Sequence, residues 1–294
     1  MRTLISFLGC CLLCTLLKAQ EHSLQQRIQH IIESSKAQIG VAAIINGKDT
    51  VTVNNEVQYP MMSVFKLHQA LAVANWLNQQ KLPLNTPVFI RPEQLRPNTY
   101  SPLRDKYPQG NLSLPVSELL TYTLQLSDNN ACDILFDNTG GTTVTDQYIR
   151  SLGITDFQIC ATEDDMHRDL TLCYRNWTTP LAAACLADQL ISRPLFDSCY
   201  QQFILQTMLT CETGKDRLPR PLSGTQVRIG HKTGTGDRNS KGEVIGFNDV
   251  GFILLPDGRH YTLAVFICNS SETDIVNAQI IAEISKAVYQ FVCP

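Results

Sequence analysis

Residues 61–77 read Met-Met-Ser-Val-Phe-Lys-Leu-His-Gln-Ala-Leu-Ala-Val-Ala-Asn-Trp-Leu. Apolar residues recur on nearly every side of this stretch, which is typical of a helix that is buried all round. Ser63 and Lys66 nevertheless stand at its start, and a spacing of three places both side chains on one face. A poorly solvated lysine favours its neutral form, so the pair suits a hydroxyl nucleophile beside a proton acceptor. By themselves, however, the same two residues are more typical of a serine helix cap followed by a surface lysine.

Strand patterns lie on both sides of a long helical region. Residues 39–45 are predicted to form a strand that turns at Asn46-Gly47 into a second strand over 50–53. The region from about 60 to 210 has helical periodicity, broken by Pro, Gly and polar loops. Three further strand patterns, followed by an amphipathic C-terminal helix, cover residues 226–233, 244–255 and 259–268.

This order predicts an α+β fold. Both chain ends contribute strands to one antiparallel sheet, terminal helices cover that sheet, and a central all-helical subdomain packs beside it. We expect residues 21–58 and 212–294 to form the α/β subdomain and residues 59–211 to form the helical subdomain. A cleft between two such parts is a usual place for a small ligand.

Composition restricts the class of protein. The chain has 294 residues and a formal net charge of -3, and 17% of its residues are charged, which argues against a disordered polyelectrolyte. Because no basic surplus exists to neutralise phosphates, the sequence argues against nucleic acid as a partner. No protein partner is implied, and we expect a monomer.

The first twenty residues are predicted to be a signal peptide. Arg2 precedes a short apolar run from Leu4 to Leu17, which is too short for a membrane span. Export to the periplasm follows, and an alternative is a lipid anchor at Cys10. Eight of the eleven cysteines lie beyond this leader, and they contain no CxxC pair that would indicate a zinc site. Their disulfide pairing stays open.

Two later motifs add polar chemistry. Ser127-Asp128-Asn129 follows an apolar helical stretch, and by itself it is typical of a turn with a helix cap. Lys232-Thr233-Gly234, followed by Thr235, is by itself typical of a strand that ends in a glycine-rich turn.

Together and in this order, the Ser63-x-x-Lys66, Ser127-Asp128-Asn129 and Lys232-Thr233-Gly234 motifs resemble the active-site set of the serine β-lactamases and penicillin-binding enzymes. The resemblance covers nearly all of the chain after the leader. It implies the fold of that family and a Ser63 acyl-enzyme formed from a small-molecule β-lactam. It implies no cofactor and no metal. The alternative is a D-alanyl-D-alanine carboxypeptidase or penicillin-binding protein, which shares the three motifs but lacks an effective deacylating glutamate.

Class A β-lactamases carry that glutamate on an Ω-shaped loop, which we place at about residues 158–177. The resemblance assigns Glu163 to this position, with the neighbouring Asp164 and Asp165 as rival carboxylates. The arginine and aspartate that commonly brace the loop are replaced by Ala161 and Asn176, so their ion pair cannot form. We therefore expect a differently routed loop, as in the cephalosporin-hydrolysing, extended-spectrum branch of class A. Asp133 and His231 resemble that branch too.

The resemblance also implies a role for each site residue. Lys66, or Glu163 through a water, takes the Ser63 proton, while Ser127, polarised by Lys232, protonates the leaving ring nitrogen. Backbone N–H groups of Ser63 and Thr235 are expected to form the oxyanion hole. The implied substrate- and water-binding residues are Asn129 for the acylamide side chain, Thr233, Gly234, Thr235 and Arg217 for the substrate carboxylate, and His167 for the hydrolytic water. For Arg217, a solvated loop position is the alternative.

Overall fold

The computed structural model describes residues 24–294, so the predictions for the leader and for Cys10 fall outside the described residues. Residues 24–32 are helical. The strands are β1 (Gln38–Ile45), β2 (Asp49–Val53), β3 (Tyr59–Pro60), β4 (Pro87–Ile90), β5 (Leu112–Pro115), β6 (Phe157–Gln158), β7 (Trp177–Thr178), β8 (Arg228–Thr235), β9 (Val244–Leu254) and β10 (His260–Ser270). The α-helices are α2 (Phe65–Gln80), α3 (Pro102–Lys106), α4 (Val116–Gln125), α5 (Asn129–Thr139), α6 (Gly141–Ser151), α7 (Glu163–Arg168), α8 (Pro180–Ser192), α9 (Ser198–Leu209) and α10 (Asp274–Val292).

The main sheet has five antiparallel strands in the order β2-β1-β10-β9-β8, so strands from both chain ends lie together as expected. Asn46 and Gly47 have φ angles of 52° and 67°, the left-handed backbone that a tight hairpin turn between β1 and β2 requires. The α+β architecture predicted from the sequence is confirmed.

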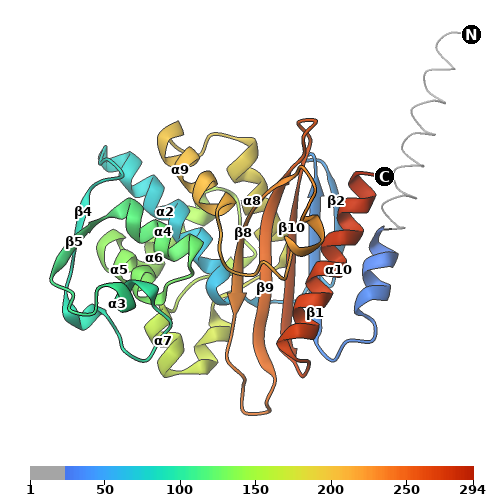
Figure 1. The fold of residues 1–294 in the computed structure, drawn as a ribbon, viewed down its shortest axis with the longest axis horizontal. Coiled ribbons are helices and arrows are strands. Elements are labelled where there is room, and N and C mark those ends of the chain that lie inside the picture. Colours follow the sequence, from blue (N-terminus) through green and yellow to red (C-terminus); the bar gives the residue numbers. More distant parts are fainter. Residues whose placement is uncertain (1–23) are drawn as a thin grey trace, which may run out of the picture.

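Side chains alternate between the two faces of the sheet, and each face has its own apolar core. On β1, Val41 and Ala43 join the core under α10 and residues 24–32, whereas Ala42 and Ile44 join the core that contains α8. In Figure 1, α10 lies along one side of the sheet, and α2, α4, α5 and α6 lie on the other. The sheet is therefore the middle layer of the molecule.

Helix α2 runs through the helical core. A single 3₁₀ turn over Met62–Val64 precedes it, and its apolar side chains from Phe65 to Leu77 are buried, except for the partly buried Trp76. This burial matches the pattern of apolar residues on every side. Since the 3₁₀ turn contacts β8 and β9, the start of α2 lies against the sheet.

A small three-stranded sheet closes the Ω-type loop. Phe157 pairs with Thr178 and Gln158 with Trp177, so β6 and β7 bring the two ends of the loop together. Helix α7 and a 3₁₀ segment, Leu170–Arg175, lie between these strands. The loop thus carries Glu163 at the N-terminus of α7, where the first-turn N–H groups favour negative charge.

Two further observations concern the described residues. None of their helices is both long and apolar enough to cross a membrane. All eight cysteines of this part of the chain are free thiols, so no disulfide bridge joins any two of them.

The sheet face under α8 supplies a stability test. Phe266 is fully buried and its ring packs 5.9 Å from that of Tyr59, whereas Phe89 is 54% exposed. We expect Phe266→Ala to lower the free energy of unfolding by about 3–5 kcal/mol, because it leaves a cavity. The control Phe89→Ala should change that free energy by less than about 0.5 kcal/mol. Urea unfolding followed by circular dichroism measures both, and equal effects would contradict this assignment of the core.

Candidate active site

The segment that carries Ser63 is fixed to the sheet. The Asn248 side-chain amide on β9 donates to the carbonyls of Pro60 and Met61, at 2.8 and 3.1 Å. Met62 follows in a left-handed conformation with φ 45°, which is uncommon for a non-glycine residue. A Cβ on Gly234 of β8 would lie 2.5 Å from the Met61 carbonyl, so glycine is required there for close approach. Gly234 thus allows β8 to approach the segment that precedes Ser63.

Ser63, Lys66 and Glu163 meet directly. Lys66 Nζ lies 3.1 Å from Ser63 Oγ and 2.8 Å from Glu163 Oε1, and Ser63 Oγ lies 3.3 Å from the same carboxylate oxygen. Lys66 is fully buried, while the Glu163 side chain is 11% exposed. The hydroxyl therefore has two candidate proton acceptors within hydrogen-bond reach, as the resemblance implied. The contact with Glu163 is direct, whereas a water-mediated one was expected.

A second hydroxyl–amine pair faces the first. Lys232 Nζ donates to Ser127 Oγ at 2.8 Å and to the carbonyl of Thr233. Burial, together with the nearby charge of Lys66, lowers the pKa of Lys232 to about 7. This amine can therefore lose its proton near neutral pH while it still contacts the Ser127 hydroxyl.

Buried hydrogen bonds fix the turn that contains Ser127. Ser127 has φ 61°, and its carbonyl accepts from Lys66 Nζ at 2.8 Å. Asp128 caps α5 by accepting from Ala131 N, and its carboxylate also binds the Ser101 hydroxyl and Leu103 N. Burial raises the pKa of Asp128, although these hydrogen bonds oppose that effect. The turn is thereby locked with its backbone carbonyl aimed at Lys66.

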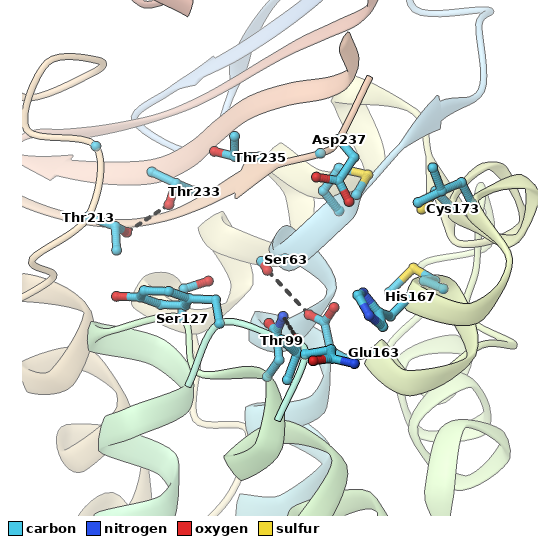
Figure 2. Close-up of a pocket in the computed structure, with 18 of the residues that line it drawn as sticks. Ser63, Thr99, Ser127, Glu163, His167, Cys173, Thr213, Thr233, Thr235 and Asp237 are labelled. Carbon is cyan, nitrogen blue, oxygen red and sulfur yellow. Dashed lines mark hydrogen bonds between the residues drawn. The ribbon is translucent and has the colours of Figure 1, made fainter. Parts of the chain in front are cut away.

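Asn129 contacts Lys66 from the same turn. Its Oδ1 accepts from Lys66 Nζ at 2.6 Å, and its Nδ2 donates to Thr99 Oγ1 at 2.7 Å. Figure 2 shows the Thr99 contact at the base of the cleft. In this state the amide donor predicted for the acylamide side chain is engaged by Thr99, so substrate binding there would exchange one hydrogen bond for another.

The Ω-type loop is braced without the common ion pair. The Asn176 side chain accepts from the N–H groups of Cys160 and Ala161 and donates to the Ala161 carbonyl. From α5, the Asp133 carboxylate accepts from Glu163 N at 2.9 Å and Asp164 N at 2.8 Å. Burial, followed by the charge of Glu163, raises the pKa of Asp133 to about 7. Hydrogen bonds to the Asn176 amide and to the Asp133 carboxylate thus replace the ion pair that Ala161 and Asn176 cannot form.

The rival carboxylates are occupied elsewhere. Asp165 accepts from Thr162 N and Oγ1, which completes the helix cap of α7. Asp164 pairs with Arg168 at 2.6 Å and with Arg96 at 3.4 Å. Glu163 is therefore the carboxylate of this run that faces Ser63.

A polar wall extends from the far end of the cleft. The hydroxyls of Thr213 and Thr233 lie 2.7 Å apart, and both side chains line the cleft with Thr235. Arg217 donates to Thr235 Oγ1 at 2.6 Å and to the carbonyls of Gly234 and Asn248.

Arg217 is only 6% exposed, so the alternative prediction, that it is a solvated loop residue, is wrong. Its guanidinium lies 3.7 Å from the centre of the Phe247 ring, and its buried Nε has no hydrogen-bond partner. Burial lowers the pKa of Arg217, but an arginine still keeps its charge near neutral pH. A fixed cation therefore stands directly behind Thr235.

The backbone of β8 offers a donor to the cleft. Gly236 N donates to Gly246 O, so Gly236 and Gly246 form a hydrogen-bonded pair of the antiparallel ladder. Because the two types of pair alternate, the adjacent pair, Thr235 and Phe247, is of the non-hydrogen-bonded type. Since β8 is the edge strand, the Thr235 N–H points away from β9. This orientation supports the predicted oxyanion donor.

Ser63, Ser127, Asn129 and Glu163 line one cleft of about 600 Å³ together with the threonines of the polar wall. Figure 2 shows Ser63 between the β8 threonines on one side and Glu163 and His167 on the other. His167 is exposed at the cleft wall and makes no hydrogen bond among the described residues. Within residues 24–294, no group of His, Cys, Asp and Glu side chains is arranged to hold a metal ion.

Comparison with known proteins agrees with this geometry. A model of the beta-lactamase enzyme family matches residues 23–292. A beta-lactamase from Bacteroides uniformis is 42% identical over 277 residues, covering 94% of this chain and 93% of that protein. A class A beta-lactamase structure from Bacteroides cellulosilyticus aligns with a TM-score of 0.88 at 40% identity, covering 92% and 98% of the two chains. The chain is a class A serine β-lactamase.

The crystal structure of the TLA-3 extended-spectrum beta-lactamase is also similar, with a TM-score of 0.90, 39% identity and coverage of 93% of this chain and 99% of that one. The β-lactamase described here is thus a hydrolase of the β-lactam amide bond, as its three motifs implied. The carboxypeptidase alternative is not favoured by these relatives.

Several supporting residues of this β-lactamase were not assigned a role from the sequence. Thr99, Thr213 and Asn248 have no motif of their own, and their partners are 20 to 188 residues away in the chain. Asp133 was noted only as a feature of the branch, and its spacing of four from Asn129 was the available signal that both face one side of α5.

The Asp133 contacts generate a test of the loop. Asp133→Asn keeps one acceptor oxygen but turns an N–H₂ toward the other backbone donor, which should cost about 1–3 kcal/mol locally. We expect faster hydrogen–deuterium exchange in residues 162–168 of this variant. Asp137, one turn further on α5, binds the single donor Gln94 Nε2, so Asp137→Asn is the control. Unchanged exchange in the Asp133 variant would show that the loop does not depend on this carboxylate.

Proposed function

We propose that Ser63 is the nucleophile that carries the acyl group and that Glu163 activates the water that later removes it. The observation that carries this proposal is the meeting of three groups: Ser63 Oγ is 3.1 Å from Lys66 Nζ and 3.3 Å from Glu163 Oε1. One hydroxyl therefore has an amine for acylation and a carboxylate for deacylation on the same side.

Acylation begins when Ser63 Oγ attacks the β-lactam carbonyl carbon. Its proton passes to Lys66 or to Glu163, both of which are within reach in this structure. The carbonyl oxygen becomes an oxyanion, for which the N–H groups of Ser63 and Thr235 are the proposed donors. Removal of one such donor costs about 2.7–4 kcal/mol in other hydrolases.

Ring opening requires a proton on the leaving nitrogen. Ser127 is the proposed donor, because its hydroxyl is held at 2.8 Å by Lys232 and its own turn is fixed by Asp128. The proton taken from Ser63 is proposed to return to Ser127 through Lys66, whose amine contacts the backbone of the Ser127 turn, while Lys232 holds the hydroxyl itself. The C–N bond then breaks and leaves an ester on Ser63.

Deacylation distinguishes this enzyme from a carboxypeptidase. Glu163 takes a proton from water, and the resulting hydroxide attacks the ester carbonyl. The bond between the acyl carbon and Ser63 Oγ then breaks, and Glu163 returns the proton to Oγ as the opened product leaves. His167 lines the cleft beside Glu163 and is the proposed second contact for that water. Asp164 and Asp165 are committed to other partners and are not expected to replace Glu163.

The proposed substrates are penicillins and cephalosporins. Both classes carry a carboxylate next to the ring, for which Thr233, Thr235 and the charge of Arg217 and Lys232 form a cationic, hydroxyl-lined wall. Asn129 is the proposed partner of the acylamide side chain. The similarity to an extended-spectrum enzyme supports cephalosporins in particular.

The remaining features concern the whole protein. We propose that the enzyme acts as a monomer and is exported to the periplasm through residues 1–20. An α/β subdomain (21–58 and 212–294) and a helical subdomain (59–211) are proposed, with the cleft between them. The core under α10 contains only residues of the first subdomain, which supports this division, whereas the other core joins the helices to the sheet through residues such as Ala42 and Ile44.

Glu163→Gln separates the two chemical steps. It removes the carboxylate base but keeps the size of the side chain, so we expect acylation to continue with Lys66 as the proton acceptor and the ester to persist. Mass spectrometry should then show the protein plus one intact substrate, with steady-state turnover lowered at least about 100-fold. The matched control Asp165→Gln should turn over fully. Loss of turnover in the Asp165 variant, with full turnover in the Glu163 variant, would identify Asp165 as the base instead.

Lys232→Arg tests the electrostatics of the cationic, hydroxyl-lined wall that is proposed to bind the substrate carboxylate. The pKa of Lys232 is about 7, so its positive charge is present below that pH and is lost as the pH rises through it. We therefore expect kcat/KM for a penicillin to fall above about pH 7. Arginine cannot lose its proton in this range, so the variant should lack this alkaline fall even if its overall rate is lower. Profiles of the same shape for both proteins would mean that Lys232 does not control this limb.

A further inference from the structure

A second, smaller pocket adjoins the substrate cleft, between residues 96–99 and helix α7 of the Ω-type loop. This side pocket has a volume of about 250 Å³, which is room for a small polar group or several water molecules. Six residues line both cavities, so the two share a border: Pro97, Asn98, Thr99, Asn129, Glu163 and His167. The mechanism proposed above gives the side pocket no role.

Two arginines line the side pocket but not the cleft. Arg96 and Arg168 reach it from different segments, and their guanidinium groups meet at one carboxylate oxygen. Arg168 Nη2 lies 2.6 Å and Arg96 Nη2 lies 3.4 Å from Asp164 Oδ2. Among residues 24–294, neither guanidinium has another hydrogen-bond or ion-pair partner. Because one carboxylate neutralises only one of the two cations, one positive charge is left over.

The other two carboxylates of the side pocket are already compensated. Glu163 Oε1 pairs with Lys66 Nζ at 2.8 Å. The Asp133 carboxylate accepts hydrogen bonds from the N–H groups of Glu163 and Asp164. The surplus of charge at the arginines is therefore not cancelled within the pocket, and this part of it favours an anion over a cation.

The backbone of Arg96 is fixed, whereas its side chain is free to turn. Asn130 is 1% exposed, and its Oδ1 accepts from Arg96 N while its Nδ2 donates to Arg96 O, both at 3.2 Å. The side chains of Arg96 and Arg168 are 48% and 63% exposed. Since exposed ion pairs are weak, either guanidinium can exchange Asp164 for another carboxylate at little cost.

The acylamide side chain of a β-lactam would reach the border of the side pocket. Asn129 is the proposed partner of the acylamide group, and it is one of the residues that line both cavities. Figure 2 shows Thr99, Glu163 and His167, which also lie on this border, on the same side of Ser63. A substituent on the carbon next to the acylamide carbonyl would therefore face the opening that leads to the arginines.

We propose that the side pocket is a subsite for a carboxylate on the acylamide side chain of the substrate, and that Arg96 and Arg168 are the specificity-determining residues that bind it. A guanidinium holds a carboxylate through two parallel hydrogen bonds, which suits this pair of side chains. No covalent step is added, and the chemistry at Ser63 is unchanged. The proposal rests on the proposed role of Asn129.

Three penicillins that differ in one substituent test this charge preference. Benzylpenicillin has a hydrogen on the side-chain α carbon, α-carboxybenzylpenicillin has a carboxylate there, and α-aminobenzylpenicillin has an ammonium group. For the wild-type enzyme, Arg96→Gln, Arg168→Gln and the double variant, kcat/KM for each charged penicillin is divided by that for benzylpenicillin. We expect each single substitution to lower the α-carboxy ratio about three- to fivefold, mainly through KM, and to raise the α-amino ratio. The double variant should lower the α-carboxy ratio at least about tenfold.

The control is Arg175→Gln. Arg175 is an exposed arginine of the same loop that lines neither cavity, so both ratios should stay within about twofold of the wild-type values. Raising the salt concentration should lower the α-carboxy ratio of the wild-type enzyme but not that of the double variant.

Unchanged ratios in the double variant overturn the subsite. Equal losses for all three penicillins overturn it too, because they would mean that the arginines only hold the loop in place. Failure of the proposed function is distinguishable from both results, since it would appear as no hydrolysis of benzylpenicillin by the wild-type enzyme.

Discussion

The Lys66 amine is the constraint on which this active site depends. It is fully buried, and a buried amine of this kind is tolerated only when hydrogen-bonding and charged partners surround it. Four such partners converge on Nζ, namely Ser63 Oγ, Ser127 O, Asn129 Oδ1 and Glu163 Oε1. They come from the start of α2, the turn before α5 and the Ω-type loop. Satisfying one amine thus requires three distant segments to meet, and they meet at the proposed catalytic site.

Local strain accompanies this convergence. Met62 and Ser127 both adopt left-handed backbone conformations, each of which costs on the order of 1–3 kcal/mol for a non-glycine residue. Such conformations persist because the surroundings determine them: Asn248 holds the carbonyls before Met62, and the Asp128 carboxylate fixes the turn after Ser127. Packing and buried hydrogen bonds elsewhere therefore offset the strain that aims Ser63 and the Ser127 carbonyl at the same amine.

The sequence predicted what depends on periodicity and on short motifs, and it missed what depends on distant partners. The strands of both chain ends and the buried helix follow from their own patterns, and the helix places Ser63 and Lys66 together by its pitch. The end of β8 was predicted too early, because Lys232-Thr233-Gly234 resembles a turn, yet its pairing with β9 continues to Thr235. For the loop, the sequence showed that an ion pair was missing. It did not show that Asn176 and Asp133 replace it, because those contacts span 15 and 30 residues.

The distances to nearby anions explain why the two buried lysines of the site, Lys66 and Lys232, can have different roles. Lys66 has a carboxylate at 2.8 Å, whereas the nearest recorded contacts of Lys232 are a hydroxyl and a carbonyl. Repulsion from Lys66 adds to burial at Lys232, and the more distant Cys211, Glu163 and Asp249 offset it only in part, so its pKa falls to about 7. An amine poised in this way can share a proton with Ser127 and still attract a carboxylate. Moving any one of these three anions toward Lys232 would raise its pKa and fix its charge, which would favour binding at the expense of proton transfer.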